Sequence, residues 1–406
     1  MSRAKVGGVL GSAAVVAAAL SVSTGTAAAD AGAVPLPQGC RALVVLGIQG
    51  TGQSSLVADP QANTGMLGSI LGPLAHDSDM TQVFIPYPAS FGSVPGTPPG
   101  PSFASSALQA QSRLDLTAAE VAAQCPTSRI AVLGYSQGAG PAMDFARREG
   151  AETGPVPSDR IAGVAAISDW TRPPGPNAIP GRPGQQSPDP VPGTSGTATS
   201  SVRLAPVPAD GGIASNPQDF GDMDGRVVEV CAPGDLACNA PEDADAVKFV
   251  AGVAAHTDFR DPISAVTSAG AAVSGSVAAA ISQTLLDDVH VQGGRVDYLP
   301  RRTISDRVAQ AAVSPDPAPP AQQTQAAAAK MQQVLGAVVA DPIGQLPHLA
   351  AELAGSIGPN LAANAADAAA LLRLAGSIGP HDSYAANPQV TQWMSAMARD
   401  SAGGRR

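Results

Sequence analysis

The stretch Arg129–Ala146, RIAVLGYSQGAGPAMDFA, decides the fold of this chain. It begins as an apolar run typical of a buried strand and ends as a helix-like run. Between the two stands Gly134-Tyr-Ser136-Gln-Gly138, the G-x-S-x-G pattern of a nucleophile elbow. The flanking residues must be small, because a side chain at either glycine would collide with the neighbouring backbone. The pattern predicts that the Ser136 hydroxyl is presented at the carboxyl end of a sheet, with a helix N-terminus behind it.

Strand and helix signals alternate on both sides of this turn. Alternation of this kind indicates an α/β layered fold with a mostly parallel central sheet. The predicted strands are 43–47, 83–87, 130–133, 161–167 and 227–230, and the predicted helices are 105–124 and the segment that follows the elbow. The interval 168–224 is dense in Pro and Gly and is predicted to be a long irregular loop, either functional or partly disordered.

Four cysteines add a second constraint. Cys231 and Cys238 enclose a short loop that carries Asp235, and a disulfide there would hold a carboxylate in place. A hydrolase serine needs a histidine base, and that base needs a carboxylate to fix its tautomer and orientation. Cys40 and Cys125 each precede a predicted strand, so they can be neighbours at the amino edge of the sheet. An even count and an export signal favour two disulfides over four free thiols.

Taken together, these features resemble the cutinase family. The resemblance is closest to the cutinase-like esterases and lipases of mycolate-containing actinobacteria, and it implies an α/β-hydrolase three-layer fold. It also implies a serine esterase that acts on lipid-like esters of a mycolate-bearing envelope. The segments that carry it are Gly134–Ala139, Cys231–Cys238 with Asp235, the pair Cys40 and Cys125, Gln49–Ser54, Tyr87–Ala89 and His381–Tyr384.

His381 is the predicted base. In this class of hydrolase the chain order is serine, acid, histidine, which disfavours His76. His381 follows a Gly-Pro turn signal and precedes a probable helix that starts at Asn387-Pro388. His256 is the alternative, because its distance in sequence from Asp235 (256 − 235 = 21) is nearer the spacing in compact cutinases. The remaining two histidines, His290 and His348, are predicted to be surface residues.

The acid and the oxyanion donors complete the predicted site. Asp235 is preferred as the acid because it follows the last predicted strand inside the cysteine loop; its rivals are Asp169, Asp222 and Asp224. An oxyanion hole needs N–H donors aimed at the developing negative oxygen. The backbone N–H of Gln137, directly after the nucleophile, is one expected donor, and the family resemblance implies Thr51 as the second.

The N-terminus predicts export. Residues 1–29 have a basic start, an apolar core and a small-residue cleavage site, which is the pattern of a secretory signal peptide. Removing them leaves 406 − 29 = 377 residues and, because two cations are lost, changes the formal charge from −10 to −12. An acidic chain without a polybasic segment argues against nucleic acid as a partner. We therefore expect a secreted or cell-envelope protein, with peripheral contact to envelope lipid as a candidate interaction.

The domain organisation predicted from these signals is one catalytic core with additions. A short extension, 30–39, precedes the core, 40–238. An Ala-rich segment, 239–380, has apolar residues at helical spacing and is interpreted as a helical insert and candidate lid, with a partly disordered spacer as the alternative. Residues 381–406 form the histidine loop and a C-terminal helix.

The resulting hypothesis is a secreted serine esterase or lipase in which Ser136, His381 and Asp235 form an acyl-enzyme and then hydrolyse it. No metal or organic cofactor is implied, because no His/Cys cluster has zinc spacing and the Gly-rich loops lack a P-loop lysine. Two alternatives stay open. One is a non-catalytic envelope lipid-binding protein on a hydrolase fold, and the other is an acyltransferase that uses the same three residues.

Overall fold

The structure is a computed structural model that describes residues 34–93, 99–241, 251, 255, 285–299, 321–355 and 381–404. The predicted signal peptide, 1–29, and the alternative base, His256, lie outside these residues. Among the helices in the described part of the chain, none is both long and apolar enough to cross a membrane.

A five-stranded parallel sheet forms the centre of the fold, with strand order β2-β1-β3-β4-β5. The strands are β1 Leu43–Ile48, β2 Met80–Phe84, β3 Arg129–Tyr135, β4 Ile161–Ile167 and β5 Val227–Val230. The three central strands are almost wholly buried, because helices cover both faces of the sheet, and this explains their continuous apolar sequences. The predicted mostly parallel α/β sheet is confirmed.

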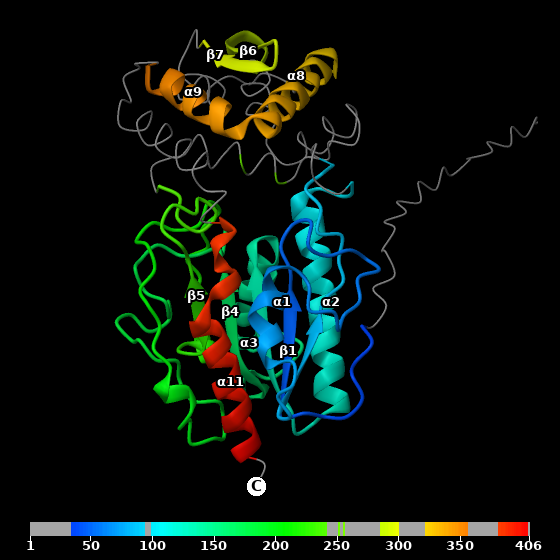
Figure 1. Cartoon of the computed structure of the whole chain (residues 1–406), viewed down its shortest axis with the longest axis vertical. Helices are drawn as coiled ribbons and strands as arrows, with labels where there is room; N and C mark the ends of the chain where they lie inside the picture. The colour runs from blue at the N-terminus through cyan, green and yellow to red at the C-terminus, as the bar shows by residue number, and fades with distance from the viewer. Residues whose placement is uncertain are drawn as a thin grey trace, which may run out of the picture. The chain divides into compact units, whose positions relative to one another are not determined.

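Helices cover the two faces of this sheet and give three layers (Figure 1). On one face, α1 and α11 bury Leu67, Ile70, Trp393 and Met394 against the strands. On the other face, α2 and α3 bury Leu114 and Phe145. The bounds are α1 Gly65–Leu71, α2 Phe103–Gln124, α3 Ala139–Gly150 and α11 Pro388–Gly403. The 3-10 turns are η1 Gly72–Leu74, η2 Ser136–Gly138, η3 Ser158–Arg160, η4 Thr199–Ser201, η5 Gly221–Met223 and η6 Ser383–Ala386.

Helix α11 begins where the sequence predicted. The Asn387 side chain accepts a hydrogen bond from the N–H of Val390 at 3.1 Å, and Pro388 is the first helical residue. Trp393 is fully buried against β4, where a Cβ built on Gly163 would lie 2.5 Å from its ring. This packing fixes the helix that directly follows the predicted catalytic histidine.

The Pro/Gly-rich loop 168–224 is packed against the core rather than loose. It buries Ile179, Val191 and Leu204 in the same apolar cluster as α11. Arg172, itself buried, donates to the carbonyls of Gly175 at 2.9 Å and Pro208 at 2.8 Å, and its Nε donates to Cys238 O at 2.8 Å. One buried guanidinium therefore ties this loop to the cysteine loop that carries Asp235.

The described part of the insert contains a β-hairpin as well as helices, so the purely helical prediction is incomplete. The hairpin pairs β6 Val289–Gln292 with β7 Arg295–Tyr298, and it is followed by α8 Ala321–Ala340 and α9 Pro342–Gly355. Gly293 and Gly294 form the two-residue turn with φ angles of +58° and +81°. Two positive φ angles are what the preferred hairpin turn requires, so a Gly-Gly pair suits it. These elements share a small apolar core that includes Val296, Tyr298 and Ala337.

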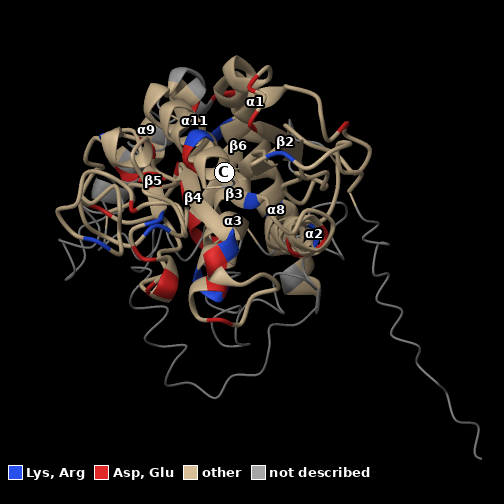
Figure 2. Ribbon diagram, turned by 90° about the horizontal axis from the view of Figure 1, so that it is seen from below, with Lys and Arg blue, Asp and Glu red and all other residues tan. Residues whose placement is uncertain are grey.

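Charged residues of opposite sign are mixed on the face shown in Figure 2. Along α3, Arg147 lies 3.4 Å from Asp144, and Arg148 pairs with Asp115 of α2 at 2.8 Å. Such pairing neutralises the described cations on this helix locally. It is unlike the continuous basic stripe of a nucleic-acid-binding surface.

Candidate active site

Ser136 occupies a strained turn between β3 and α3. Its φ angle is +52°, a left-handed conformation that is uncommon for a residue with a side chain. A Cβ built on Gly134 would lie 2.4 Å from Gly138 O, and one built on Gly138 would lie 2.2 Å from Ile48 O. Both glycines are therefore sterically required, as the G-x-S-x-G pattern predicts. Ser136 itself is only partly covered, so its hydroxyl can meet a substrate.

His381 connects Ser136 to Asp235. Its Nε2 lies 2.9 Å from the Ser136 Oγ, and its Nδ1 lies 3.1 Å from the Asp235 Oδ1. The imidazole side chain is 28% exposed, whereas that of Asp235 is 1% exposed. An ionised Asp235 can only accept, so Nδ1 carries a proton and Nε2 is free to accept one from Ser136. The structure thus brings together the three residues that the sequence nominated as nucleophile, base and acid.

A disulfide and three hydrogen bonds hold the Asp235 loop. Cys231 and Cys238 are joined, with their Cα atoms 5.9 Å apart. Within the loop, the N–H of Ala237 donates to Asp235 Oδ1 at 3.0 Å. The hydroxyl of Tyr384 donates to the other carboxylate oxygen, Oδ2, at 2.8 Å and accepts from the N–H of Ala232 at 2.7 Å. The carboxylate is consequently fixed from both sides.

The electrostatics of the site keep Asp235 ionised. Burial alone would raise the pKa of this carboxyl, but hydrogen bonds from His381, Ser168 and Tyr384 outweigh it and hold the pKa below its ordinary value. The pKa of Tyr384 is raised, first by burial and then by the charge of Asp235, so its hydroxyl stays protonated and keeps donating. At neutral pH the Asp235 carboxylate is therefore negatively charged and faces the ring of His381.

Ser168, which the sequence analysis did not single out, also contacts His381. It stands directly after β4, is fully buried, and has a φ angle of +56°. Its Oγ lies 3.0 Å from His381 Nδ1, and its hydroxyl also interacts with Asp235. Because Nδ1 donates, Ser168 accepts from the ring, and its hydroxyl also helps to hold the pKa of Asp235 low. In the sequence, the one signal that could have pointed to Ser168 was its position after a predicted strand. Its contact with His381 could not be foreseen, because the two residues are 213 positions apart.

Tyr135 and Tyr384 support the histidine segment. The Tyr135 hydroxyl, next to the nucleophile in sequence, donates to the backbone carbonyl of His381 at 2.8 Å. Tyr384 was already part of the H-x-x-Y segment in the family resemblance, but the sequence assigned it no role. Its contact with Asp235 now gives it one, which is to orient the acid.

The loop after β1 lies beside the elbow. A Cβ built on Gly50 would lie 3.1 Å from the Ser136 Cβ and 2.8 Å from the Tyr135 ring, so this backbone passes directly next to the nucleophile. Thr51, the predicted second oxyanion donor, is the next residue. On the other side, the Gln137 side chain is buried and donates to Ser90 O at 2.9 Å. That bond holds in place the residue whose N–H is the first predicted donor.

The three other candidate acids, Asp169, Asp222 and Asp224, do not occupy the position beside His381 that Asp235 takes. Asp169 is buried and accepts from the N–H and hydroxyl of Thr171 at 2.8 and 2.9 Å. Asp222 and Asp224 stand before β5, at the end of that strand opposite to the Asp235 loop. The second disulfide, Cys40–Cys125, also lies at the amino ends of the strands, with Cα atoms 5.4 Å apart.

The parallel sheet, the elbow and the serine–histidine–aspartate arrangement define an α/β hydrolase. The sequence matches the family model for cutinase over residues 39–259, and the chain belongs to the cutinase family. It is a carboxylic-ester hydrolase of that family, which confirms the resemblance noted in the sequence. The match ends before His381, so the histidine at the site lies in a part of the chain that the family model does not reach.

The chain is similar to several individual proteins. The Culp6 homolog of Corynebacterium glutamicum, a carboxylesterase, is 30% identical over 216 residues, which cover 50% of this chain and 67% of that protein. Among solved structures, an acetylxylan esterase is 20% identical, with 57% of this chain and 100% of that chain covered and a TM-score of 0.36. A cutinase-like protein from Cryptococcus sp. is 16% identical, with 50% and 82% covered and a TM-score of 0.33.

Proposed function

We propose that this chain is an exported serine esterase that hydrolyses lipid-like carboxylic esters through an acyl-enzyme. The observation that carries the proposal is the hydrogen-bonded sequence Ser136 Oγ, His381 Nε2, His381 Nδ1, Asp235 Oδ1, with separations of 2.9 Å and 3.1 Å. A serine that is hydrogen-bonded to a histidine, which is itself oriented by a buried carboxylate, is the arrangement that generates an alkoxide-like nucleophile.

The reaction would run in two halves. In the first, His381 Nε2 takes the Ser136 proton as Oγ attacks the ester carbonyl, and the tetrahedral intermediate places its negative oxygen toward the N–H groups of Gln137 and Thr51. The intermediate collapses, and His381 returns the proton to the departing alcohol. In the second half, His381 takes a proton from water, the resulting hydroxide attacks the acyl carbonyl, and Ser136 leaves with that proton.

Ser168 acts in this scheme as a positioning residue. Its hydroxyl accepts from Nδ1–H and helps to hold the pKa of Asp235 low, so it bridges the base and the acid. This bridge keeps the ring in the tautomer that exposes Nε2 to the nucleophile. Because Ser168 is fully buried, it makes no direct contact with substrate in this scheme.

The proposal also includes export and a lipid-like substrate. The signal pattern at 1–29 supports export, and two disulfides fit an oxidising compartment. The Ala-rich insert supports an apolar substrate because its position in the chain brings it to the active site. It begins just after Asp235 and ends just before His381, two residues whose side chains are 3.1 Å apart, so both its ends return to the active site.

The insert is accordingly proposed to cover the acyl-binding side of the serine. Lipases use such covers to exclude water and to offer an apolar surface. Replacing most of 239–380 with a short flexible linker should leave a core that cleaves small soluble esters but loses much more of its turnover on long-chain esters. Equal losses on both would show that the insert only packs on the outside of the core.

A direct assay tests the proposed function. Purified mature protein should hydrolyse fluorogenic short-chain esters, and Ser136→Ala should not. If the wild-type protein, shown to be folded by circular dichroism, turned over no ester while binding lipid vesicles, the non-catalytic lipid-binding alternative would replace this proposal.

A further inference from the structure

Helix α9 is docked through polar side chains on the edge of strand β7 that faces away from β6. The Gln345 Oε1 accepts from the N–H of Val296 at 2.9 Å, and the Glu352 carboxylate, through Oε2, accepts from the N–H of Tyr298. These two N–H groups are two residues apart on the strand, and the two acceptors are two helical turns apart on α9. The contacts therefore fix the register of the helix against the strand. His348 lies on the helix between Gln345 and Glu352.

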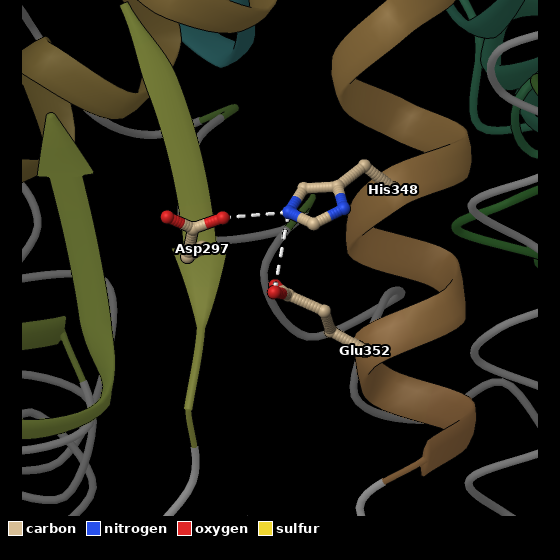
Figure 3. A group of neighbouring side chains, drawn as sticks. All are labelled: Asp297, His348 and Glu352. Atoms are coloured by element: carbon tan, nitrogen blue, oxygen red, sulfur yellow. Dashed lines mark hydrogen bonds and ion pairs between the residues drawn. The ribbon is translucent and has the colours of Figure 1, made fainter. Parts of the chain in front are cut away.

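His348 faces two carboxylates in this arrangement (Figure 3). Its Nε2 lies 2.7 Å from Asp297 Oδ1 and 3.2 Å from Glu352 Oε1. His348 and Glu352 are four residues apart on one helix face, and Asp297 comes from the strand opposite. The sequence predicted His348 as a surface residue, but its side chain is 23% exposed, against 30% for Asp297 and 19% for Glu352.

We propose that Asp297, His348 and Glu352 form a binding site for a divalent transition-metal ion of the Zn²⁺ type. The three donor atoms lie within 4.8 Å of one another. One imidazole nitrogen with two carboxylate oxygens suits zinc-like ions, whereas Ca²⁺ prefers all-oxygen sites with more ligands. Three protein ligands with partial exposure leave a coordination position for water.

The geometry needs only a small adjustment to accept the ion. Metal–ligand bonds of about 2.0–2.1 Å in a tetrahedral site put ligand atoms about 3.3 Å apart. The His348–Glu352 pair is already at 3.2 Å, and the His348–Asp297 pair has to open from 2.7 Å. The bond from Tyr298 N–H to the far oxygen of Glu352 orients that ligand in advance, as outer contacts do in metal sites.

Asp297 is ionised under ordinary conditions, which a ligand carboxylate must be. A hydrogen bond from His348 is the main cause that holds the pKa of Asp297 below its usual value, and Arg295 adds to it. Because imidazole and carboxylate groups bind a metal ion only in their unprotonated forms, metal affinity should fall as the pH falls.

Arg295 is the competitor for this site. Its Nε donates to Asp297 Oδ1 at 2.9 Å and lies 3.3 Å from His348 Nε2. Its side chain is 61% exposed, so it can swing out into solvent when an ion enters. The competing interpretation is that the guanidinium is the permanent cation of a structural ion-pair network. The two interpretations predict opposite effects when Arg295 is removed.

The test is calorimetric titration of ZnCl₂ into the full-length mature protein after treatment with EDTA. We expect one Zn²⁺ per chain, and a loss of affinity of at least about tenfold in Asp297→Asn, His348→Gln and Glu352→Gln. Glu352→Gln keeps an acceptor for the Tyr298 N–H, so it separates ligation from folding. Arg295→Ala should tighten binding several-fold, and His76→Ala, in the catalytic core, is the matched histidine control.

Two readouts keep the proposal falsifiable. Circular dichroism without metal checks that each variant is folded, and the visible spectrum of bound Co²⁺ should disappear in His348→Gln but survive in His76→Ala. The proposal is overturned if neither the wild-type protein nor Arg295→Ala binds Zn²⁺. It is equally overturned if binding is unchanged in His348→Gln, because the cluster would then be an ion-pair network only.

Discussion

Ser136 and Ser168 are two serines in the same backbone conformation at the carboxyl ends of neighbouring strands, β3 and β4. Their φ angles are +52° and +56°, and their hydroxyls lie 2.9 Å and 3.0 Å from the ring of one histidine, His381. They differ in the nitrogen they face, because Ser136 contacts Nε2 and Ser168 contacts Nδ1. They also differ in access, since Ser136 is partly exposed and Ser168 is fully buried.

Local strain alone therefore does not identify a nucleophile. Both serines adopt a left-handed backbone conformation, which is strained for a residue with a side chain. Backbone strain of this kind is concentrated at functional sites. What separates the two is the proton that each can exchange. Ser136 can give its proton to an unprotonated Nε2, whereas Ser168 meets an Nδ1 that already carries one. Substitutions at the two serines, and at the residues that support them, can test this division of roles.

The largest effect should come from the nucleophile and the base. Ser136→Ala and His381→Ala should each lower kcat for ester hydrolysis by roughly 10⁴- to 10⁶-fold, because nucleophile and base act as a unit. Steady-state assays on short-chain esters measure this. His256→Ala is the control and should stay near wild type. A near-normal rate in His381→Ala together with a loss in His256→Ala would show that the base is wrongly assigned.

The second largest kinetic effect should come from replacing the acid, Asp235. Asp235→Asn keeps the shape of the side chain but lets His381 adopt the wrong tautomer, so kcat should fall by about 10⁴-fold. Asp169→Asn is the matched comparison, since this carboxylate is equally buried but bonds to Thr171. Its main effect should be on thermal unfolding. Similar kinetic losses in both variants would contradict the choice of Asp235.

The two disulfides should separate stability from activity. Cys40–Cys125 closes a loop of 85 residues, and Cys231–Cys238 closes one of 7. The chain-entropy model assigns them about 4.5 and about 2.4 kcal/mol respectively. Replacing the first pair by serine should mainly lower the free energy of unfolding, measured in denaturant. Replacing the second should cost less stability but reduce turnover, because Asp235 loses its clamp. The reverse pattern would contradict this division.

Ser168 should give the smallest kinetic effect. Ser168→Ala removes the hydroxyl that contacts the His381 ring and lowers the pKa of Asp235. The positioning that it supplies is worth about 1–1.5 kcal/mol, so kcat should fall about tenfold with KM little changed. Ser168→Gly should show the same kinetic loss while relieving backbone strain of about 1 kcal/mol, which makes it more stable than Ser168→Ala. Unchanged kcat in both variants would remove Ser168 from the mechanism.

A pH measurement distinguishes positioning from packing at Ser168. Because its folded pKa is lowered, Asp235 contributes stability that is present above the unfolded pKa and is lost as pH falls through the folded pKa. Removing the Ser168 bond should raise the folded pKa and reduce that contribution. Thermal unfolding on the acid side of neutrality should then depend less on pH in Ser168→Ala. A purely structural role would lower stability equally at all pH values.

Much of the fold was readable from the sequence because its signals are local. The G-x-S-x-G turn lies between an apolar strand and a helix, and Asn387-Pro388 marks a helix start. These patterns depend only on neighbours in the chain. The hairpin at Gly293-Gly294 had a local signal as well, but the Ala-rich composition of the surrounding segment led to a helical interpretation.

The unpredicted contacts depend on tertiary packing. Ser168 meets His381 only because β4 lies beside β3 and the C-terminal segment returns over the same edge, across 213 residues. Likewise, Asp297 and His348 are 51 residues apart, and no spacing rule joins a strand carboxylate to a helix histidine. The role of Tyr384 was hidden for the same reason, although its position in the H-x-x-Y segment was visible.

Covalent labelling tests most directly whether Ser136 and Ser168 have different roles. The mature protein would be treated with a fluorophosphonate ester, which phosphonylates activated serines, and then digested and mapped by mass spectrometry. Our account predicts one adduct, on Ser136, that is absent in Ser136→Ala and His381→Ala and forms more slowly in Ser168→Ala. An adduct on Ser168, or stoichiometric labelling of Ser136 that does not depend on His381, would contradict it.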